Sequence, residues 1–355
     1  MAASETKRMA DYPLFDWLRI AMAGTVATGH AGLLPWQPAA NLAVQVFFAL
    51  SGWLIGTILI EMSRDKLPLF YFNRTTRVWI PYLLALALLY LVSLAREPID
   101  GRWFEFLFYD VTFTHNLFAL LPSAKAALQA MPLKGAGNHF WSIAVEEQFY
   151  LVAPIILLFA PGGRRPVTWV VLGVVLILVR QEFSAIALGV AAAAMQARRP
   201  GFHAGGWPRI AIAAMLAVSA LGLFSPAWYP RLSSLFAIGL VLLLARPGRR
   251  GTLGRFLGGV SYPFYLNHWI ALATASGLAK HLGGRMEAWA VVGLLLALGI
   301  ASVAYWLVDR QIMIRRRHWF TPALGQRLAV LSYLLVGTGL VVGIGLHGGW
   351  PGWWA

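Results

Sequence analysis

Residues 13–34 read PLFDWLRIAMAGTVATGHAGLL, a mostly apolar run of the length, roughly 20 residues, that one helical crossing of a membrane takes. The run is too long for the core of a cleavable signal peptide, and it contains Asp16, Arg19 and His30. We therefore expect it to be retained as the first span. Similar runs recur, and we predict spans near residues 14–34, 41–62, 77–95, 141–160, 166–180, 183–197, 209–225, 230–246, 258–280, 288–308 and 328–347. The fifth and sixth are short, so we expect about ten or eleven spans.

Composition agrees with this interpretation. Of the 355 residues, 59% are hydrophobic and 12% are charged, whereas about 25% of the residues in an average soluble domain are charged. The net charge of +15 would suggest nucleic-acid binding in a soluble protein. Here the basic residues stand in short clusters between apolar runs, as in loops that face anionic lipid. We predict a single all-α domain over residues 1–355, a polytopic bundle of transmembrane helices that contacts membrane lipid and binds no nucleic acid.

The absence of cysteine narrows the chemistry that the chain could carry. With no cysteine in the sequence, disulfides, iron–sulfur clusters and thiol nucleophiles are excluded.

The basic residues also predict the orientation of the chain. With the N-terminus in the cytoplasm, twenty Lys and Arg residues fall on the inner side and eight on the outer side, as the positive-inside rule requires. Residues 96–139 then form one long outer loop. If its apolar run, residues 103–121, crossed the membrane, the basic residues at 162–165 would move outside. We therefore expect an interfacial cap on the outer face, and a basic inner loop plus a terminal span in residues 311–355.

Arg19 and His30 are ionisable residues inside the first span, where such residues are costly and commonly mark a site. Eleven residues at 100° each is close to three full turns, so both side chains lie on nearly one face, roughly 16 Å apart along the axis. His30 would be the nearer to the outer side. The alternative is that each is hydrogen-bonded to a neighbouring helix and has a structural role only.

Two adjacent carboxylates, Glu146 and Glu147, lie near the outer end of the span that begins at Trp141. Adjacent helical positions are about 100° apart, so the two side chains cannot point in one direction. We expect one to face a central cavity and the other to face a neighbouring helix or an interfacial cation. The alternative is that both lie near lipid headgroups and stabilise the start of the helix.

Arg74 and Arg77 lie three residues apart on the inner side, before the third span. If a helix begins there they share a face, and two guanidinium groups on one face suit phosphate recognition. Taken alone, ordinary contact with lipid explains the pair better.

Two other spans carry candidate residues. In the second, Gly52 and Gly56 are spaced for close helix approach, and Ser51 could line a ligand site. In the ninth, Asn267 and His268 are candidate buried polar residues, for which a structural role is at least as good an explanation as a catalytic one.

Taken together, five motifs resemble the acyltransferase-3 family of membrane O-acyltransferases. They are Arg19 with His30 eleven residues later, Phe-Phe-x-Leu-Ser-Gly-x-Leu-Ile at residues 47–55, Phe-x-x-x-Arg-x-x-Arg at 70–77, Trp-Ser-x-x-x-Glu-Glu-Gln-Phe-Tyr at 141–150, and Ser-Tyr-x-x-Tyr-Leu-x-His at 261–268. Each motif alone is weak, but five in this order are specific, and they place the family-like core at residues 11–310. Many relatives begin the first motif Asp-Gly-x-Arg, where this chain has Asp-Trp-Leu-Arg at 16–19.

The resemblance implies that an acyl group, with acetyl expected, passes from cytoplasmic acyl-CoA to an outer hydroxyl group, typically on a sugar of a surface glycoconjugate. Acyl-CoA would be a co-substrate and no cofactor would be bound permanently. His30 would be the general base, since a neutral imidazole near pH 7 suits that role. A transient acyl-His is the alternative chemistry. Glu146 would orient His30 or hold the acceptor, and Glu147 is nearly as good a candidate.

The other matched residues would bind the substrates. Arg74 and Arg77 would hold the CoA phosphates, and Arg19 would lie along the path of the pantetheine or phosphate. The further motif residues expected to contact substrate are Ser51, Trp141, Glu147, Tyr150, Tyr262 and His268. No metal is required. The expected location is a bacterial inner membrane, with many spans and a cytoplasmic N-terminus, where the protein would modify polysaccharide by O-acetylation.

Two rival functions use the same features. A secondary transporter or flippase for a glycoconjugate would also need intramembrane Arg, His and Glu residues for proton coupling. It would be expected to show an inverted repeat, and none is visible in the sequence. A non-enzymatic membrane scaffold is the other rival, and the aligned ionisable residues of the first span argue against it.

Overall fold

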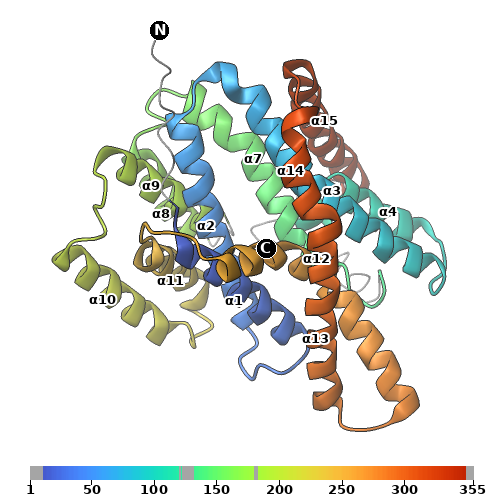
Figure 1. Ribbon diagram of the computed structural model, residues 1–355. Coiled ribbons are helices and arrows are strands. Elements are labelled where there is room, and N and C mark those ends of the chain that lie inside the picture. Colours follow the sequence, from blue (N-terminus) through green and yellow to red (C-terminus); the bar gives the residue numbers. More distant parts are fainter. Residues whose placement is uncertain (1–10, 120, 122–131, 180–182, 349–355) are drawn as a thin grey trace.

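The computed structural model describes residues 11–119, 121, 132–179 and 183–348. Within these ranges the chain is a bundle of helices without strands (Figure 1). The α-helices are α1 (Pro13–His30), α2 (Ala39–Glu61), α3 (Leu67–Leu94), α4 (Gly101–Val111), α5 (His115–Phe118), α7 (Trp141–Phe159), α8 (Pro166–Leu178), α9 (Ser184–Arg198), α10 (Gly206–Gly222), α11 (Tyr229–Leu244), α12 (Thr252–Leu282), α13 (Met286–Ala304), α14 (Arg310–Trp319) and α15 (Pro322–His347). Short helices of other types are η1 (Arg64–Lys66), η2 (Asn138–Phe140) and the π-helix η3 (Tyr305–Asp309). A helix stands at each predicted span, so the predicted all-α polytopic bundle is confirmed.

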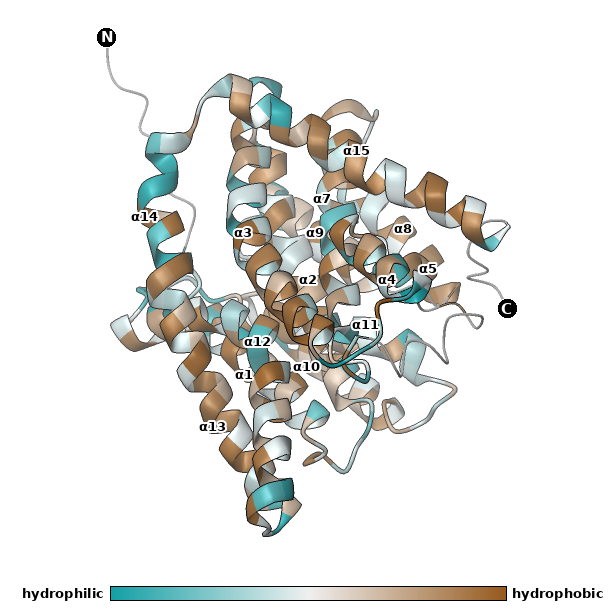
Figure 2. Cartoon of the chain, turned by 90° about the vertical axis from the view of Figure 1, so that its right-hand side faces the viewer, coloured by the Kyte–Doolittle hydropathy of each residue, from teal (hydrophilic) through white to brown (hydrophobic). Residues whose placement is uncertain are grey.

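The helices have the character of membrane spans. In the described part of the chain, five helical stretches are long and apolar enough to cross a membrane, namely Ala39–Glu61, Arg64–Leu94, Asn138–Phe159, Met286–Trp319 and Pro322–His347. Helices α8, α10 and α11 are apolar but shorter. Exposed apolar side chains such as Leu295, Val341 and Leu346 cover α13 and α15, and Figure 2 shows both helices largely brown beside the hydrophilic α14. Apolar faces of this extent need lipid rather than water around them, so this is a membrane protein.

Helix α2 lies at the centre of the bundle and packs against α1, α7, α9 and α11. Small residues let α9 lie directly against it. A Cβ atom added at Gly52 would lie 2.1 Å from the carbonyl oxygen of Ile186, and one at Gly189 would lie 2.2 Å from the carbonyl oxygen of Ala49. A Cβ atom added at Gly56 would lie 3.0 Å from Cβ of Ala193, also in α9. The close approach predicted from the spacing of Gly52 and Gly56 is therefore confirmed, and α9 is the partner.

The apolar run at residues 103–121 does not span the bundle. It forms α4, which is 11 residues long and so about 16 Å in length, and the four-residue α5. Asp110 of α4 is fully buried and lies 2.7 Å from both His115 Nδ1 and the hydroxyl of Tyr90. These contacts fix the two short helices against α3, as a cap would require.

Helix α12 has 31 residues and contains Pro263. Proline removes one backbone hydrogen bond and bends a helix. The bend divides α12 into a first part that crosses the face of the molecule and a second part that runs to the hairpin with α13 (Figure 1). The second part carries His268.

Residues 310–319 correct one expectation. We expected a basic inner loop after residue 310, but α13 continues through η3 into α14 as one helical stretch, Met286–Trp319. Arginine has a high helix propensity, and cations are favourable in the last turn of a helix, where Arg316 and Arg317 lie. Arg316 also donates to the carbonyl oxygen of Asn73 in α3 at 3.4 Å. The basic segment is therefore part of the bundle wall.

Candidate active site

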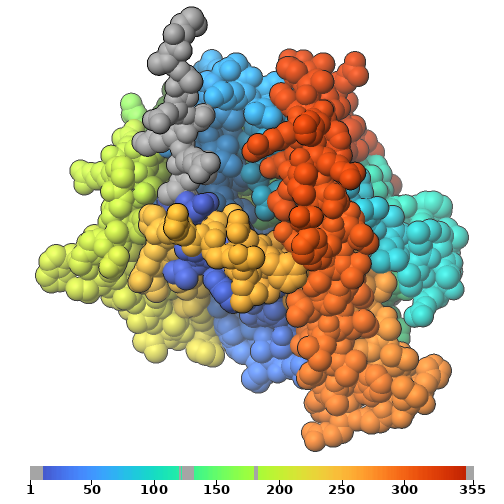
Figure 3. All heavy atoms as spheres, viewed as in Figure 1, coloured from blue at the N-terminus to red at the C-terminus, as the bar shows by residue number. Residues whose placement is uncertain are grey.

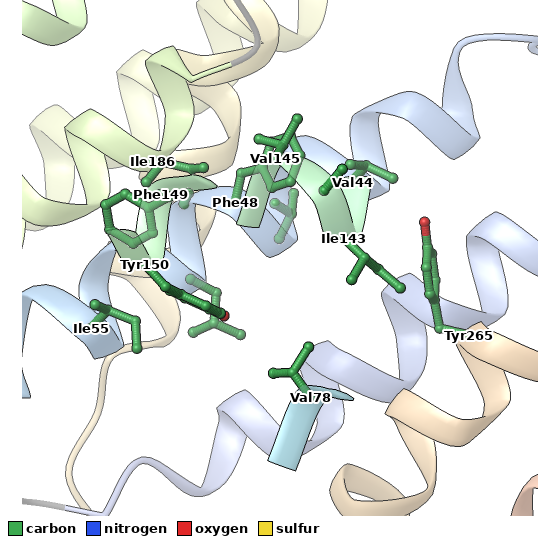
Figure 4. Close-up of a cluster of buried hydrophobic side chains, with 14 of the residues drawn as sticks. Val44, Phe48, Ile55, Val78, Ile143, Val145, Phe149, Tyr150, Ile186 and Tyr265 are labelled. Carbon is green, nitrogen blue, oxygen red and sulfur yellow. The ribbon is translucent and has the colours of Figure 1, made fainter. Parts of the chain in front are cut away.

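A cavity of about 320 Å³ lies inside the bundle. Its wall is built from α1, α2, α3, α7, α12, η3 and α14. On the face shown in Figure 3, α14 stands beside α3 and the first part of α12 crosses below them. Figure 4 shows part of the apolar wall, where Ile55 of α2, Val78 of α3, and Ile143 and Tyr150 of α7 surround a common space. The cavity therefore brings together segments that are far apart in the sequence.

Three arginines line this cavity, Arg19 from α1 and Arg74 and Arg77 from α3. Helix α3 begins at Leu67, ahead of the predicted span, so Arg74 and Arg77 lie inside the helix, one turn apart. Arg74 is half-buried, with its guanidinium carbon 5.9 Å from the ring centroid of Tyr150, and Arg77 is exposed. The cavity is thus electropositive on one side.

Asp16 holds Arg19 in place. The carboxylate of Asp16 is buried and lies 3.3 Å from Nη1 of Arg19. Arg19 is one helical turn after Asp16 in α1. The same carboxylate accepts two hydrogen bonds of 2.6 Å from Arg250, in the segment that precedes α12. These bonds raise the pKa of Arg250. Asp16 therefore has two cationic partners, whereas no ion pair of Arg74 or Arg77 is formed within the described part of the chain.

Two polar atoms of the cavity wall are buried without a hydrogen-bond partner among the described residues, Nε of Arg74 and Oδ2 of Asp309. Buried polar atoms are nearly always paired. Asp309 ends the π-helix η3, and such helices occur frequently at functional sites. A ligand with an anionic group for Arg74 and an N–H or O–H donor for Asp309 would satisfy both atoms.

The two adjacent carboxylates of α7 have different surroundings. Glu146 lines the cavity and accepts hydrogen bonds from Ser51 at 2.5 Å and from Tyr150 at 3.3 Å. Glu147 points to α3, where it accepts a bond of 2.9 Å from the indole of Trp79. The helical offset that we used to separate the two side chains thus places Glu146 at the cavity and Glu147 against a neighbouring helix.

Histidines from three segments meet at the end of α1. Nδ1 of His30 lies 2.8 Å from Nε2 of His268 in α12, with the ring centroids 5.0 Å apart. The ring centroid of His139, in η2, is 4.8 Å from that of His268 and 6.5 Å from that of His30. His30 is exposed, whereas His139 and His268 are buried. Sequence analysis missed His139, and its only signal was its position two residues before the Trp-Ser motif.

Tyr265 separates the cavity from these histidines. Its ring lines the cavity, and its hydroxyl lies 2.7 Å from Ser142 Oγ and donates to the carbonyl oxygen of His139 at 2.8 Å. His30 is not part of the cavity wall, and its hydrogen-bond partner is His268 rather than Glu146. The structure thus gives Glu146 and His30 separate surroundings.

Two other motif residues are placed by the bundle. Tyr262 lines the cavity and donates to the carbonyl oxygen of Val78 at 3.1 Å. Trp141 packs edge-on against Phe48 with ring centroids 5.9 Å apart and is not among the cavity-lining residues. In the described part of the chain, no group of three or more His, Cys, Asp or Glu side chains is arranged to hold a metal ion.

The fold and the site are those of a polytopic membrane protein with a ligand-sized, electropositive cavity. The sequence model of the acyltransferase-3 family, described as an acyltransferase domain, matches residues 12–309. The chain therefore belongs to this family of enzymes, and the resemblance seen in its five motifs is confirmed.

Three relatives show how far the similarity extends. The chain is 30% identical over 160 residues to a Staphylococcus aureus (strain COL) protein named "Putative O-acetyltransferase", covering 42% of this chain and 25% of the relative. It is 30% identical over 155 residues, 41% of this chain and 23% of the relative, to the Bacillus subtilis (strain 168) "Putative peptidoglycan O-acetyltransferase YrhL". An uncharacterized Haemophilus influenzae protein is 29% identical over 129 residues, covering 35% of this chain and 52% of that protein. The matches thus cover about a quarter to a half of these relatives. No solved structure matches the chain.

Proposed function

We propose that this protein transfers an acyl group, with acetyl expected, from cytoplasmic acyl-CoA to a hydroxyl group of a glycan on the other side of the membrane. One geometric observation carries the proposal. Helix α1 presents Arg19 to a cavity that also contains Arg74 and Arg77, and it ends at His30, which pairs with His268. A donor site and a base would therefore stand on one helix, roughly 16 Å apart. Membership of the family and the names of the relatives support this class of reaction.

The donor would bind with its phosphates at the arginines. Guanidinium groups make strong, charge-assisted hydrogen bonds to phosphate, and Nε of Arg74 has no partner among the described residues. The slender pantetheine arm would extend along the apolar wall past Ile55 and Val78. Asp309 would accept a hydrogen bond from an N–H or O–H group of the donor, which supplies the partner that Oδ2 lacks.

The acceptor would react at His30. Its hydroxyl oxygen would attack the thioester carbonyl carbon while Nε2 of His30 takes the hydroxyl proton. The tetrahedral intermediate would then expel the thiolate of CoA as the carbon–sulfur bond breaks. His30 would return its proton to that sulfur, so that the products are an ester and CoA with a free thiol. After these steps His30 would again be neutral and ready for another turnover.

The thioester would need to pass Tyr265 to reach His30, because Tyr265 and Ser142 line the cavity and His30 does not. Movement of the Tyr265 side chain would open this path. In this arrangement Glu146 would act on the donor side, where it holds Ser51 and Tyr150, rather than orient His30.

The test is acyl transfer by purified protein in lipid nanodiscs, with acetyl-CoA as donor and soluble peptidoglycan and polysaccharide fragments as acceptors, followed by mass spectrometry of the glycans. His30→Ala should lower the rate at least about 100-fold, because a positioned general base contributes about 10²- to 10⁴-fold. The control is His281→Ala, which changes an exposed histidine near the end of α12. Transfer by His30→Ala above about a tenth of the wild-type rate would contradict the base role. Size-exclusion chromatography would check folding of each variant.

A further inference from the structure

The hydrogen bond between His30 and His268 has a direction that follows from the partners of His268. Nδ1 of His268 lies 2.7 Å from the backbone carbonyl oxygen of Tyr265. A carbonyl oxygen can only accept, so Nδ1 of His268 carries the hydrogen. In a neutral imidazole the other nitrogen is then an acceptor. Nε2 of His268 must therefore accept a hydrogen bond.

The donor to this nitrogen is Nδ1 of His30, 2.8 Å away. His30 thus carries its hydrogen on Nδ1, and its lone pair is on Nε2. No described residue forms a hydrogen bond with Nε2 of His30, and the His30 side chain is exposed, whereas His268 is 1% exposed. In this series His30 donates to His268, and His268 donates to the carbonyl oxygen of Tyr265. The basic nitrogen that remains is Nε2 of His30, on the exposed ring.

We infer that His268 is a positioning residue that holds His30 in the tautomer with the lone pair on Nε2, the nitrogen that takes the proton from the acceptor hydroxyl. The inference rests on the proposed general-base role of His30. A histidine whose second nitrogen has a fixed partner keeps one tautomer and one ring orientation. The carbonyl of Tyr265 has here the orienting role that a carboxylate has in a catalytic triad, with His268 as an intermediate ring.

His139 supports the same arrangement by packing. Its Nδ1 lies 3.0 Å from the carbonyl oxygen of Ala136, so this nitrogen also carries the hydrogen. Its ring meets that of His268 at an interplanar angle of 62°. With His139 on one side and His30 stacked at 22° on another, the His268 ring has little freedom to rotate away from His30.

The direct test reads the tautomers without any substrate. The full-length protein, labelled with ¹⁵N-histidine in nanodiscs, would be studied by NMR correlations that distinguish protonated from unprotonated ring nitrogens. Each of the eight histidines would be assigned by its single substitution. We expect His30, His139 and His268 to be protonated on Nδ1. His203 is an internal control for which we expect the other tautomer. Its Nε2 lies 2.8 Å from the carbonyl oxygen of Ala245, so its hydrogen must be on Nε2.

Two variants connect the tautomer to the rate. His268→Gln keeps a side-chain oxygen that can accept from His30, whereas His268→Leu has a similar size and no acceptor. We expect His268→Leu to give a mixture of His30 tautomers and a kcat at least about tenfold lower with unchanged KM for acetyl-CoA, since the wrong tautomer of a catalytic histidine costs up to about 10⁴-fold. His268→Gln should retain the Nδ1–H form of His30 and a kcat within about threefold of wild type.

The outcomes separate this inference from the proposed function. A wild-type His30 protonated on Nε2 would overturn the positioning role, even if His30→Ala is inactive. Equal kcat for His268→Leu and wild type would overturn it as well. If instead His30 has the expected tautomer and His30→Ala keeps its activity, then the general-base proposal fails and the catalytic use of the pair fails with it.

Discussion

At the scale of single residues, the three cavity arginines are the strongest indication of an anionic ligand. Like charges that share a partly desolvated space repel one another more strongly than in water. Arg19 has Asp16 as a close partner, whereas no ion pair with a carboxylate is formed by Arg74 or Arg77 among the described residues. Binding of a phosphate would relieve the repulsion and provide partners for both guanidinium groups.

We therefore expect Arg74→Ala and Arg77→Ala each to weaken binding of acetyl-CoA. A hydrogen bond to a charged group contributes about 1.5–3 kcal/mol, which corresponds to roughly one to two orders of magnitude in Kd. Lysine should replace either arginine only partly, because it lacks the planar fork of donors. The measurement is titration calorimetry of acetyl-CoA into the purified protein.

The matched control is Arg231→Ala, because Arg231 stacks on Trp228 and donates to the carbonyl oxygen of Ala227, away from the cavity. Its Kd should equal that of wild type. Unchanged affinity in both Arg74→Ala and Arg77→Ala would return these two arginines to a role in contact with lipid headgroups.

Candidate functional residues could be identified from the sequence where they lie in a motif or inside an apolar span. Ionisable residues within apolar runs, such as Arg19 and Glu146, are conspicuous, and both line the cavity. Asp309 was missed because it follows a predicted span and belongs to no motif. Its place at the end of the π-helix η3 and in the cavity wall depends on tertiary packing. His139 was missed for the same reason, since only the fold brings it to His268.

At the scale of helices, the crossing of α2 and α9 depends on glycine. Gly52→Ala should destabilise the protein, because the added Cβ would lie 2.1 Å from a backbone oxygen of Ile186 and the helices would have to move apart. Overpacking of this kind costs about 1–3 kcal/mol. Thermal unfolding in detergent, followed by circular dichroism, should show a lower Tm.

Gly24→Ala is the control within the same bundle. It also replaces a helical glycine, but apart from its chain neighbours and the nearby backbone of α1 no described atom lies within 4 Å of the added Cβ. Alanine favours a helix over glycine by about 1 kcal/mol, so this variant should be as stable as wild type or slightly more so. A Tm for Gly52→Ala equal to that of Gly24→Ala would show that the two helices are not held at the distance described.

Helix positions were largely predictable from the sequence, because a membrane span is defined by a local property, the length of an apolar run. Helix ends were less predictable. Helix α3 begins at Leu67, about ten residues before the predicted span, since Arg and Asn residues that end an apolar run do not end a helix. For the same reason, we expected a loop at residues 310–319, where the structure has the basic helix α14. Which helices touch, and which side chains face the cavity, required the structure, because span length carries no information on helix pairing.

At the scale of the whole molecule, three of the basic segments lie together at one end. Arg64 of η1 donates to the carbonyl oxygen of Leu158, at the end of α7, and Arg164 donates to the carbonyl oxygen of Met62. Arg316 of α14 contacts Asn73 near the start of α3. The loop between α2 and α3, the loop after α7 and α14 therefore share one end, and the hairpin between α12 and α13 lies at the other end (Figure 1). Three of the segments that the positive-inside rule assigns to one side are thus neighbours in space.

This arrangement sharpens the prediction of orientation. We expect the end with η1 and α14 to face the cytoplasm, because cytoplasmic loops carry an excess of Lys and Arg and because acyl-CoA would enter the cavity from that side. The chain has no cysteine, so the natural sequence is already a cysteine-free background into which single cysteines can be introduced. Lys66→Cys and Arg165→Cys are exposed sites at the proposed inner end, and Lys134→Cys and Arg285→Cys are exposed sites at the proposed outer end.

In intact cells, or in spheroplasts where an outer membrane is present, a membrane-impermeant maleimide should label Cys substitutions at positions 134 and 285 only. Permeabilised cells should show labelling at all four sites, which demonstrates that the inner pair is reactive. The reverse pattern would place the arginine-lined end of the cavity outside, where cytosolic acyl-CoA could not reach it. Labelling of positions 66 and 134 from the same side would contradict the bundle itself, because α3 separates these positions with its 28 residues, about 42 Å of helix.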